Sequence, residues 1–518
     1  MKFDKGQILK NVGSSWFALG LNILLGIFLT PYILHRLGDT AFGLWILIFS
    51  ATGYYGLFDL GIRSSIIRYV AKYVATDAQE ELNRLVNTAM FSYGGIALVT
   101  MAITVIASVY VTKIFRIPGE FGETARWLLL MVGTSVSLGF PLGVFGGILE
   151  GLQRFYLLNF TSISSMLLRA LLIVIALEHG RGLLTIAFIT VSLPLLGGLI
   201  NGVAVFWHLR LRLGASYVSR SSLRQIASYG GTTFLILVAG RLRFKTDALV
   251  IGTFLSATAV TYFTIGSRLV EYSTELVHSM AQIFLPMSSQ SDALGDLARL
   301  RKIFVAGNRM CALVILPVCA IWVILGKSVI EAWVGARYVA TSYPVLLILL
   351  FPSTMMLMQT ASSRVLFGMG KHQMLAKVTL AEGIANLVLS VLLVRKFGIV
   401  GDAIGTAIPL SCTVLLFIPQ HLCRLLKLRL LSYLREAFLL PLVLTMPLVI
   451  ALLLLRRWFI PHHLLQLAGQ VAMALSVYGA GIGWAVWTRR AWKIDVVSYD
   501  EQDAEAGVEL VETSRQEA

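Results

Sequence analysis

The segment GRLRFKTDALVIG, residues 240–252, places three basic residues and one acid within seven positions, between two apolar runs. Each charged residue near the centre of a membrane helix costs about 2.5–3.5 kcal/mol to insert. Four such charges exceed what the surrounding apolar residues return, so they are expected to face protein or water rather than lipid. If the segment is one helix, Arg243 and Asp247 lie four residues apart and can pair. Arg241 and Lys245 then share a different face that has no local acid.

This arrangement predicts two roles for the four charges. Arg243 and Asp247 are interpreted as a structural ion pair that fixes helix packing. Arg241 and Lys245 are predicted to contact an anionic ligand, and the alternative is that their long side chains extend toward the inner membrane interface. Arg169, in the apolar run LLRALLIV, also lacks a local acid and is predicted to face a cleft.

A second polar stripe follows in the next apolar run. Four of its ionisable residues fall within one 80° sector of a helix, and they are Arg268, Glu271, Glu275 and His278. Arg268 is predicted to contact substrate, whereas the two carboxylates and the imidazole are candidates for binding protons or a coupling cation. The alternative is a self-neutralising ladder that holds this helix to a neighbour.

Asp59 and Arg63 lie four residues apart near the end of another apolar run. Asp59 is therefore a further candidate for ion coupling. An interfacial ion pair that caps the helix is the alternative interpretation.

The elements that position these residues are membrane helices. The chain has 518 residues, of which 57% are apolar and 14% charged, and its mean hydropathy is +0.79. A soluble domain carries about 25% charged residues. Apolar runs of about twenty residues recur along the sequence, and they predict fourteen membrane helices, at about residues 11–34, 41–60, 85–112, 127–149, 156–178, 183–206, 228–255, 258–285, 304–326, 340–367, 374–394, 400–419, 436–455 and 465–487.

The basic residues favour one topology for these spans. With the N-terminus inside, the inner connections hold 24 Lys and Arg residues and the outer connections hold 11, as the positive-inside rule expects. Both termini are then cytoplasmic. If residues 241–245 were a cytoplasmic loop, every later connection would change sides and the rule would be violated, so these residues are predicted to lie within the seventh helix.

The spans divide into two halves. Residues around the first two helices align with those around the seventh and eighth at an offset of 218, which pairs Leu37 with Leu255 and Trp45 with Phe263. Six helices per half give both halves the same orientation, related by an axis along the membrane normal. The predicted organisation is an N-terminal six-helix lobe, a C-terminal six-helix lobe, helices 13–14 and an acidic disordered tail, at residues 1–210, 211–425, 426–490 and 491–518.

Three stretches carry a family resemblance. TPYILHRLGDTAFGLW (residues 30–45) and YGLFDLGIRSSIIRYVAKYVA (55–75) resemble the opening of Wzx-type bacterial polysaccharide flippases, and KTDALVIGTFLSATAVTYFTIGSRLVE (245–271) resembles the start of their second half. These flippases belong to the multidrug/oligosaccharidyl-lipid/polysaccharide exporter superfamily. The resemblance extends over about residues 6 to 420. It implies two six-helix lobes and export of lipid-linked oligosaccharides.

The expected function is a flippase, not an enzyme, that moves undecaprenyl-diphosphate-linked oligosaccharide across a bacterial inner membrane by alternating access. No P-loop, HExxH, GxSxG or GxGxxG motif occurs, and no cofactor, metal or nucleic acid is expected. Membrane lipids and other polysaccharide-assembly proteins are the expected partners. Two rival functions remain: a cation-coupled multidrug exporter, which predicts an acidic cleft, and a membrane glycosyltransferase or polymerase, which predicts large outer loops or a catalytic acid in a loop. A non-transporting scaffold is a further alternative.

Overall fold

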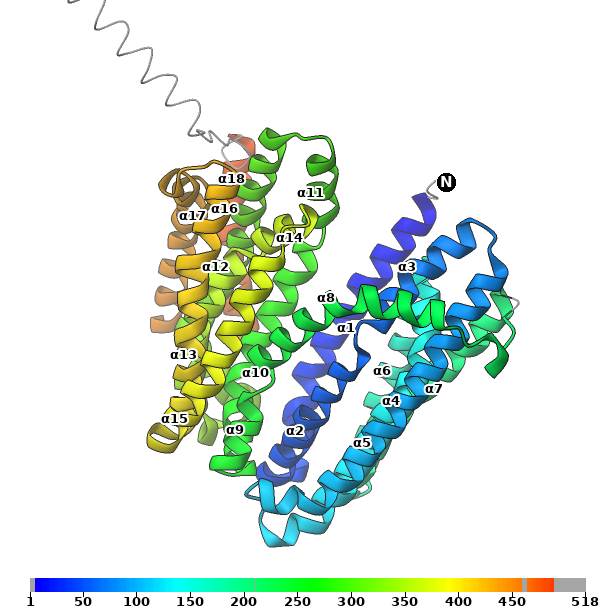
Figure 1. Ribbon diagram of the computed structural model, residues 1–518. Coiled ribbons are helices and arrows are strands. Elements are labelled where there is room, and N and C mark those ends of the chain that lie inside the picture. The colour runs from blue at the N-terminus through cyan, green and yellow to red at the C-terminus, as the bar shows by residue number, and fades with distance from the viewer. Residues whose placement is uncertain (1–4, 210, 459–463, 489–518) are drawn as a thin grey trace, which may run out of the picture. The chain divides into compact units, whose positions relative to one another are not determined.

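The computed structural model describes residues 5–209, 211–458 and 464–488, and in these ranges it contains helices and no β-strand. Eleven helical segments of the described chain are long and apolar enough to cross a membrane. The predicted class, an all-α polytopic membrane protein, is therefore confirmed. By its internal contacts the chain divides into two units, Met1–Thr261 and Tyr262–Ala518, and each is described by itself (Figure 1).

In its described residues, the first unit contains six helices of 24 or more residues and several shorter ones. Its elements are α1 Lys5–Leu37, α2 Asp39–Gly53, the 3₁₀ helix η1 Tyr54–Asp59, α3 Ile62–Ala75, α4 Gln79–Ile114, η2 Gly119–Phe121, α5 Gly122–Gly151, α6 Phe155–Glu178, α7 Leu183–His208, η3 Ala215–Tyr217, α8 Arg220–Phe244 and α9 Asp247–Phe254.

The second unit begins inside α10, which spans Ala257–Ala281. Its other elements are α11 Phe284–Ala293, α12 Leu297–Val334, η4 Ala336–Tyr338, α13 Val339–Met358, α14 Thr360–Gly368, α15 Gln373–Cys412, the π-helical turn η5 Thr413–Phe417, α16 Ile418–Leu425, α17 Leu430–Trp458 and α18 Leu464–Trp487.

Small residues let the helices of the first unit approach closely. A Cβ atom at Gly151 of α5 would lie 2.9 Å from the backbone oxygen of Ile67 in α3, and one at Gly133 would lie 2.3 Å from the side chain of Thr104 in α4. Membrane helices associate largely by such close backbone packing, because lipid is as apolar as their side chains. α5 therefore packs tightly against α3 and α4 (Figure 1).

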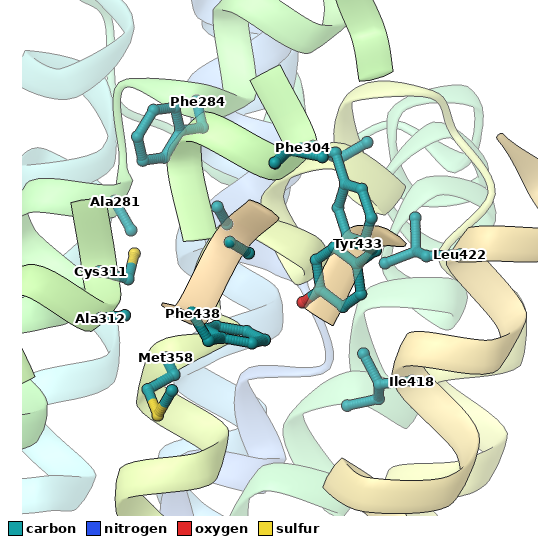
Figure 2. Packing of buried hydrophobic residues seen from close by; sticks show 14 of the residues in the cluster. Ala281, Phe284, Phe304, Cys311, Ala312, Met358, Ile418, Leu422, Tyr433 and Phe438 are labelled. Atoms are coloured by element: carbon teal, nitrogen blue, oxygen red, sulfur yellow. The ribbon is translucent and has the colours of Figure 1, made fainter. Parts of the chain in front are cut away.

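The second unit has a core built on aromatic residues. Phe304 of α12 stacks on Tyr433 of α17 with ring centroids 4.5 Å apart, and Phe438 meets Tyr433 edge-on (Figure 2). Tyr433 is fully buried, and its hydroxyl accepts a hydrogen bond from Asn308 Nδ2 at 3.1 Å. A buried tyrosine needs such a partner for its polar end. These contacts fix α17 against α12.

The predicted single helix at 228–255 is wrong. α8 ends at Phe244 and α9 begins at Asp247, with Lys245 in a non-helical conformation between them. The Thr246 hydroxyl bonds back to the Leu242 carbonyl oxygen at 2.7 Å, as threonine does where it competes with the helix ladder. The span of 228–255 and the next predicted span, 258–285, are not among the eleven apolar candidates.

Other boundaries differ in smaller ways. The predicted span 340–367 is interrupted at Gln359, where α13 ends and α14 begins. The predicted spans 374–394 and 400–419 are found as two helical parts of α15, which are separated at Gly398, where the non-helical φ of 60° favours glycine. The two parts pack against each other, since a Cβ atom at Gly401 would lie 2.3 Å from the backbone oxygen of Leu393. Two inner connections contain helices that were not predicted, α3 and α11. The predicted acidic tail, residues 491–518, lies outside the described residues.

The offset of 218 recurs in the backbone of the described chain. Equivalent starting positions are found for α2 and α10, for α4 and α12, and for α6 and α15. Residues with positive φ recur in the same way, at Asp77 and Gly295 and at Gly180 and Gly398. Thr40 and Thr258, which are 218 residues apart, hydrogen-bond to each other through their hydroxyls at 3.0 Å. These positions support the predicted two-fold repeat. Its symmetry axis and the predicted domain boundaries stay predictions.

Candidate functional site

The first unit contains an open cavity of about 750 Å³ among α2, α3, α5, α6 and α7, with both apolar and polar lining residues. Three charged residues line it, Arg63, Glu150 and Arg169. Its neutral polar lining consists of Thr52, Ser135, Asn159, Thr161, Ser162, Ser165, Thr190 and Asn201. Binding sites for small molecules typically have volumes of about 300–1,000 Å³ and a few convergent polar groups. This cavity is therefore the candidate functional site.

Glycine creates much of the empty space. A Cβ atom added at Gly139 or Gly143 of α5 would meet no atom within 4 Å, and both glycines line the cavity. Gly197 and Gly198 of α7 also line it. A side chain at any of these positions would project into the cavity or against its wall. The missing side chains leave room for a ligand.

Arg63 and Glu150 form an ion pair at the cavity wall. The Arg63 Nη2 atom lies 2.5 Å from Glu150 Oε1, and the two side chains are 49% and 21% exposed. A Cβ atom at Gly146, one helical turn before Glu150, would lie 3.7 Å from Arg63 Nη2. The guanidinium thus lies along the glycine surface of α5, with one face open to the cavity.

Arg169 enters the cavity from the middle of α6. Within the part of the chain that the structure describes, its guanidinium has no hydrogen bond and no ion pair. An arginine at this depth in a membrane helix is costly unless it faces a polar space. The prediction that Arg169 faces a cleft agrees with its position, and its contact with substrate stays a prediction.

The neutral polar groups of the cavity suit hydroxyl-rich ligands. Thr161 donates to the Asn201 Oδ1 atom at 3.1 Å, which leaves the Asn201 amide nitrogen for another partner. The Thr190 hydroxyl is buried and has no partner among the described residues. Side-chain amides and hydroxyls both donate and accept hydrogen bonds, as sugar hydroxyls do.

The predicted pairing of Asp59 with Arg63 is wrong. The motif FDLGI forms a left-handed turn, in which Leu60 has φ 49° and Gly61 has φ 76°, so η1 ends at Asp59 and α3 begins at Ile62. The two charged residues therefore do not share one helix. Asp59 accepts a hydrogen bond from the Tyr93 hydroxyl of α4, whereas Arg63 pairs with Glu150.

The helix break also separates the charges of the opening heptapeptide. Arg241 and Arg243 belong to α8, Asp247 opens α9, and Lys245 lies in the break. The helical-wheel angles that placed Arg241 with Lys245, and Arg243 with Asp247, do not apply across this break. The roles assigned to the four residues stay predictions.

Arg241 has well-defined surroundings. A Cβ atom at Gly56 of η1 would lie 2.7 Å from Arg241 Nη2, so its guanidinium packs on a glycine surface. The Tyr54 hydroxyl, which bonds Thr246 Oγ1 at 2.8 Å, holds the adjacent helix break in place. Arg241 is partly exposed and forms no ion pair with a described residue.

The polar stripe of α10 lies in the second unit. α10 is continuous, so Arg268, Glu271, Glu275 and His278 share one helix as predicted. Arg268 Nη1 and Glu271 Oε2 form an ion pair at 2.7 Å. This contact supports the alternative of a self-neutralising ladder for these two residues. Ion coupling by Glu271, Glu275 and His278, and substrate contact by Arg268, stay predictions.

Glu150 is the site residue that the sequence analysis missed. Glu150 is the acid in GGILEG, at the end of a predicted membrane span, and this position indicated only the inner end of a helix. The one available signal is the pair Gly146 and Gly147, a helical turn before an acid, which permits close approach of a long basic side chain. The distant partner, Arg63, has no signal in the local sequence.

The fold now defines a class. Long apolar helices with a polar cavity inside one unit are typical of polytopic membrane transporters. Two solved structures share this fold. The first is titled "Lipid II flippase MurJ, inward closed conformation" (TM-score 0.69, 14% identity, 94% of this chain and 100% of that chain covered). The second is an inward-facing multidrug resistance MATE family transporter of the MOP superfamily (TM-score 0.65, 17% identity, 81% and 95% covered).

The chain belongs to the family described as "Polysaccharide biosynthesis protein", whose model matches residues 8–292, more than half of its length. The protein named "Putative O-antigen transporter" from Shigella flexneri is 20% identical over 418 residues, which cover 79% of this chain and 96% of that protein. The resemblance to polysaccharide flippases is thus confirmed. The family and these relatives support a flippase-type membrane transporter.

Proposed function

We propose that this protein moves undecaprenyl-diphosphate-linked oligosaccharide from the inner to the outer leaflet of a bacterial cytoplasmic membrane. The product would supply surface polysaccharide such as O-antigen, capsule or exopolysaccharide. The observation that carries the proposal is the cavity of the first unit, where Arg63, Arg169 and one acid, Glu150, face a space otherwise lined by amides, hydroxyls and apolar groups. The cytoplasmic placement of both termini is part of the same proposal.

The cavity charges match an anionic headgroup. Two guanidinium groups against one carboxylate give the lining a net positive charge. Two unit charges 4 Å apart attract each other by about 4 kcal/mol at an effective dielectric constant of 20. Guanidinium groups also bind phosphate oxygens in a bidentate geometry. A diphosphate or an acidic sugar is therefore the favoured ligand at this wall.

The volume of the cavity limits what it holds. About 750 Å³ is the size of an ordinary small-molecule site, so it accommodates the diphosphate with its first sugars but not a polyprenyl chain. In this proposal the lipid tail stays in the bilayer while the polar headgroup crosses through the protein. Alternating access then requires only that the cavity change the side from which it is reached.

The charge of the cavity also separates the proposal from its rivals. A cation-coupled exporter of organic cations is expected to have an acidic site, whereas this lining has one acid and two bases. A glycosyltransferase or polymerase is expected to carry a large outer loop, and the connections counted as outer, such as residues 115–121 and 179–182, are short. Arg241, Lys245 and Arg268 are proposed as further substrate contacts, with Asp59, Glu271, Glu275 and His278 as candidates for ion coupling.

The test uses a strain that depends on this protein for its surface polysaccharide. Replacement of Arg169 by Gln is expected to lower surface polymer at least tenfold at normal protein abundance, because the neutral amide cannot balance a phosphate charge. Arg84→Gln is the matched control, since Arg84 pairs with Glu80 on the exposed surface of α4, away from the cavity. Normal polymer in the Arg169 variant would overturn the proposal for this cavity.

A second experiment tests the heptapeptide. Arg241 and Lys245 are replaced together by Gln, and surface polymer is measured beside protein abundance. A role in substrate contact predicts loss of polymer with the protein still in the membrane. Normal polymer at normal abundance removes these two residues from the proposed substrate path.

A further inference from the structure

Arg63 and Glu150 form an ion pair at the wall of the cavity. The carboxylate lies 2.5 Å from the guanidinium, at a wall where the arginine side chain is half exposed. Both residues line the cavity, and Arg169 is the third charged group of its lining. A carboxylate and a phosphate oxygen make the same kind of bidentate contact to arginine. The Glu150 carboxylate therefore stands where an anionic ligand would bind.

We infer that Glu150 is an internal substitute for the substrate anion, which the substrate displaces from Arg63 and which takes up one proton as it is displaced. The inference rests on the proposed function, because it requires an anionic headgroup in this cavity. It links ligand binding to protonation at one named carboxylate.

The charge balance of the cavity supplies the reason. With Arg63, Arg169 and Glu150 ionised, the lining carries one net positive charge. Entry of a diphosphate with two negative charges makes the total negative and places like charges close together. A carboxylate near another anion is driven toward its neutral form. The proton comes from water, adds to a carboxylate oxygen of Glu150, and leaves every bond of the substrate unchanged.

The surrounding elements offer no competing acid on this wall. α3 contributes Arg63 and α6 contributes Arg169, while the lining residues of α2 and α7 are uncharged. Arg154, which precedes α6, donates to the Tyr156 hydroxyl at 3.0 Å. Asp59 is held by Tyr93 of α4 and is not part of the lining. Among the described lining residues, Glu150 is the group that can take up the proton.

The first measurement is proton uptake on ligand binding. The full-length protein is placed in nanodiscs of zwitterionic lipid and titrated with undecaprenyl diphosphate in weakly buffered solution containing a pH indicator, with undecaprenol as the neutral probe. Wild type is expected to take up close to one proton more per bound diphosphate than Glu150→Gln. Glu150→Asp is the matched control, because it keeps a carboxylate and is expected to retain the uptake.

Binding affinity gives an independent readout. Because Glu150 competes with the ligand when it is ionised, Glu150→Gln is expected to bind undecaprenyl diphosphate at least tenfold more tightly than wild type at pH 8. Toward lower pH the affinity of wild type should approach that of the variant, by up to about tenfold per pH unit for one linked proton. Any titration of the diphosphate itself appears equally in both proteins and cancels in the comparison.

A third readout requires no variant. The infrared difference spectrum between free and ligand-bound wild type should gain the C=O stretch of a protonated carboxyl group. Equal proton uptake by wild type and Glu150→Gln, or no carboxyl band in wild type with ligand bound, overturns the inference while leaving the proposed function intact. Failure of wild type to bind undecaprenyl diphosphate more tightly than undecaprenol overturns both.

Discussion

Two ion pairs between arginine and glutamate, one in each unit, differ in what surrounds them. Arg63 and Glu150 lie 2.5 Å apart at the wall of a polar cavity, with 49% and 21% of their side chains exposed. Arg309 and Glu436 lie 3.0 Å apart between α12 and α17, and their side chains are 4% and 26% exposed. Arg309 also donates to the Glu436 backbone oxygen. The same two residue types thus form a pair that lines a cavity in one unit and a pair that packs between two helices in the other.

The two pairs have the same residue types, and they differ mainly in the burial of the arginine. A buried charge pair loses its hydration, so its removal exposes the full cost of the remaining partner. A pair at a cavity wall keeps part of its hydration and can exchange its partner for a ligand. Substitutions at each pair are therefore expected to have different effects on stability and on transport.

The largest effect is expected at the buried pair. Arg309→Ala removes a buried guanidinium that pairs with the Glu436 carboxylate and donates to the Glu436 backbone oxygen, and it should lower the free energy of unfolding by about 3 kcal/mol. Denaturant or thermal unfolding of the purified protein measures this loss. The double variant Arg309→Met/Glu436→Leu should regain most of the stability, because apolar residues of similar volume often replace a buried ion pair without penalty. Transport that survives in the double variant would identify the pair as structural.

The corresponding exchange at the cavity should have the opposite outcome. Arg63→Met/Glu150→Leu removes both charges and is expected to fold with a change in stability of about 1 kcal/mol or less, as partly exposed pairs contribute little. Surface polymer should nevertheless fall at least tenfold, because the cavity loses a phosphate-binding group. The comparison between the two units fails if this double variant supports normal polymer production.

Glycine substitutions sharpen the same contrast. A Cβ atom at Gly266 of α10 would lie 2.5 Å from the backbone oxygen of Ser342 in α13. Backbone cannot yield as a flexible side chain does, so Gly266→Ala should destabilise the second unit by about 2 kcal/mol. A shift in the midpoint of unfolding measures it. An unchanged midpoint would show that α10 and α13 can separate at no cost.

The smallest effect on stability is expected at the cavity wall. Gly143→Ala places its Cβ where no atom lies within 4 Å, so it should leave the free energy of unfolding unchanged or raise it by up to about 1 kcal/mol, as alanine favours helix. A graded series, Gly143→Ala, Val and Leu, should lower transport progressively as the cavity fills. Equal transport by all three variants would mean that the ligand does not use this wall.

The sequence predicted the fold at the level of apolar spans. A run of about twenty apolar residues is a property of the local sequence, and the thickness of the apolar bilayer requires it of a spanning helix. The offset of 218 could also be found in the sequence, because equivalent turns in the two halves carry similar residues. The break at Lys245 was not, since it depends on Thr246 bonding both Leu242 and the distant Tyr54. A helical wheel assumes a continuous helix and cannot detect such an interruption.

The candidate site was less predictable for a similar reason. Arg169 could be singled out because an arginine in an apolar run is costly wherever its partners lie. The pairing of Arg63 could not, because a left-handed turn at Leu60 and Gly61 removes the i, i+4 relation to Asp59. Its real partner, Glu150, lies 87 residues away. Local spacing identifies unusual residues, whereas their partners follow from tertiary packing.

The hydrogen bond between Thr40 and Thr258 has one further consequence. Under the repeat of 218 residues each threonine is the counterpart of the other, so each side offers its partner the same group, as in an isologous contact of a homodimer. In a homodimer a single substitution necessarily changes both sides of such a seam. Here the two sides are encoded separately, and one can change without the other. Because both halves belong to one chain, the residues of one half can change in evolution while those of the other half stay the same. A symmetric homodimer cannot change in this way.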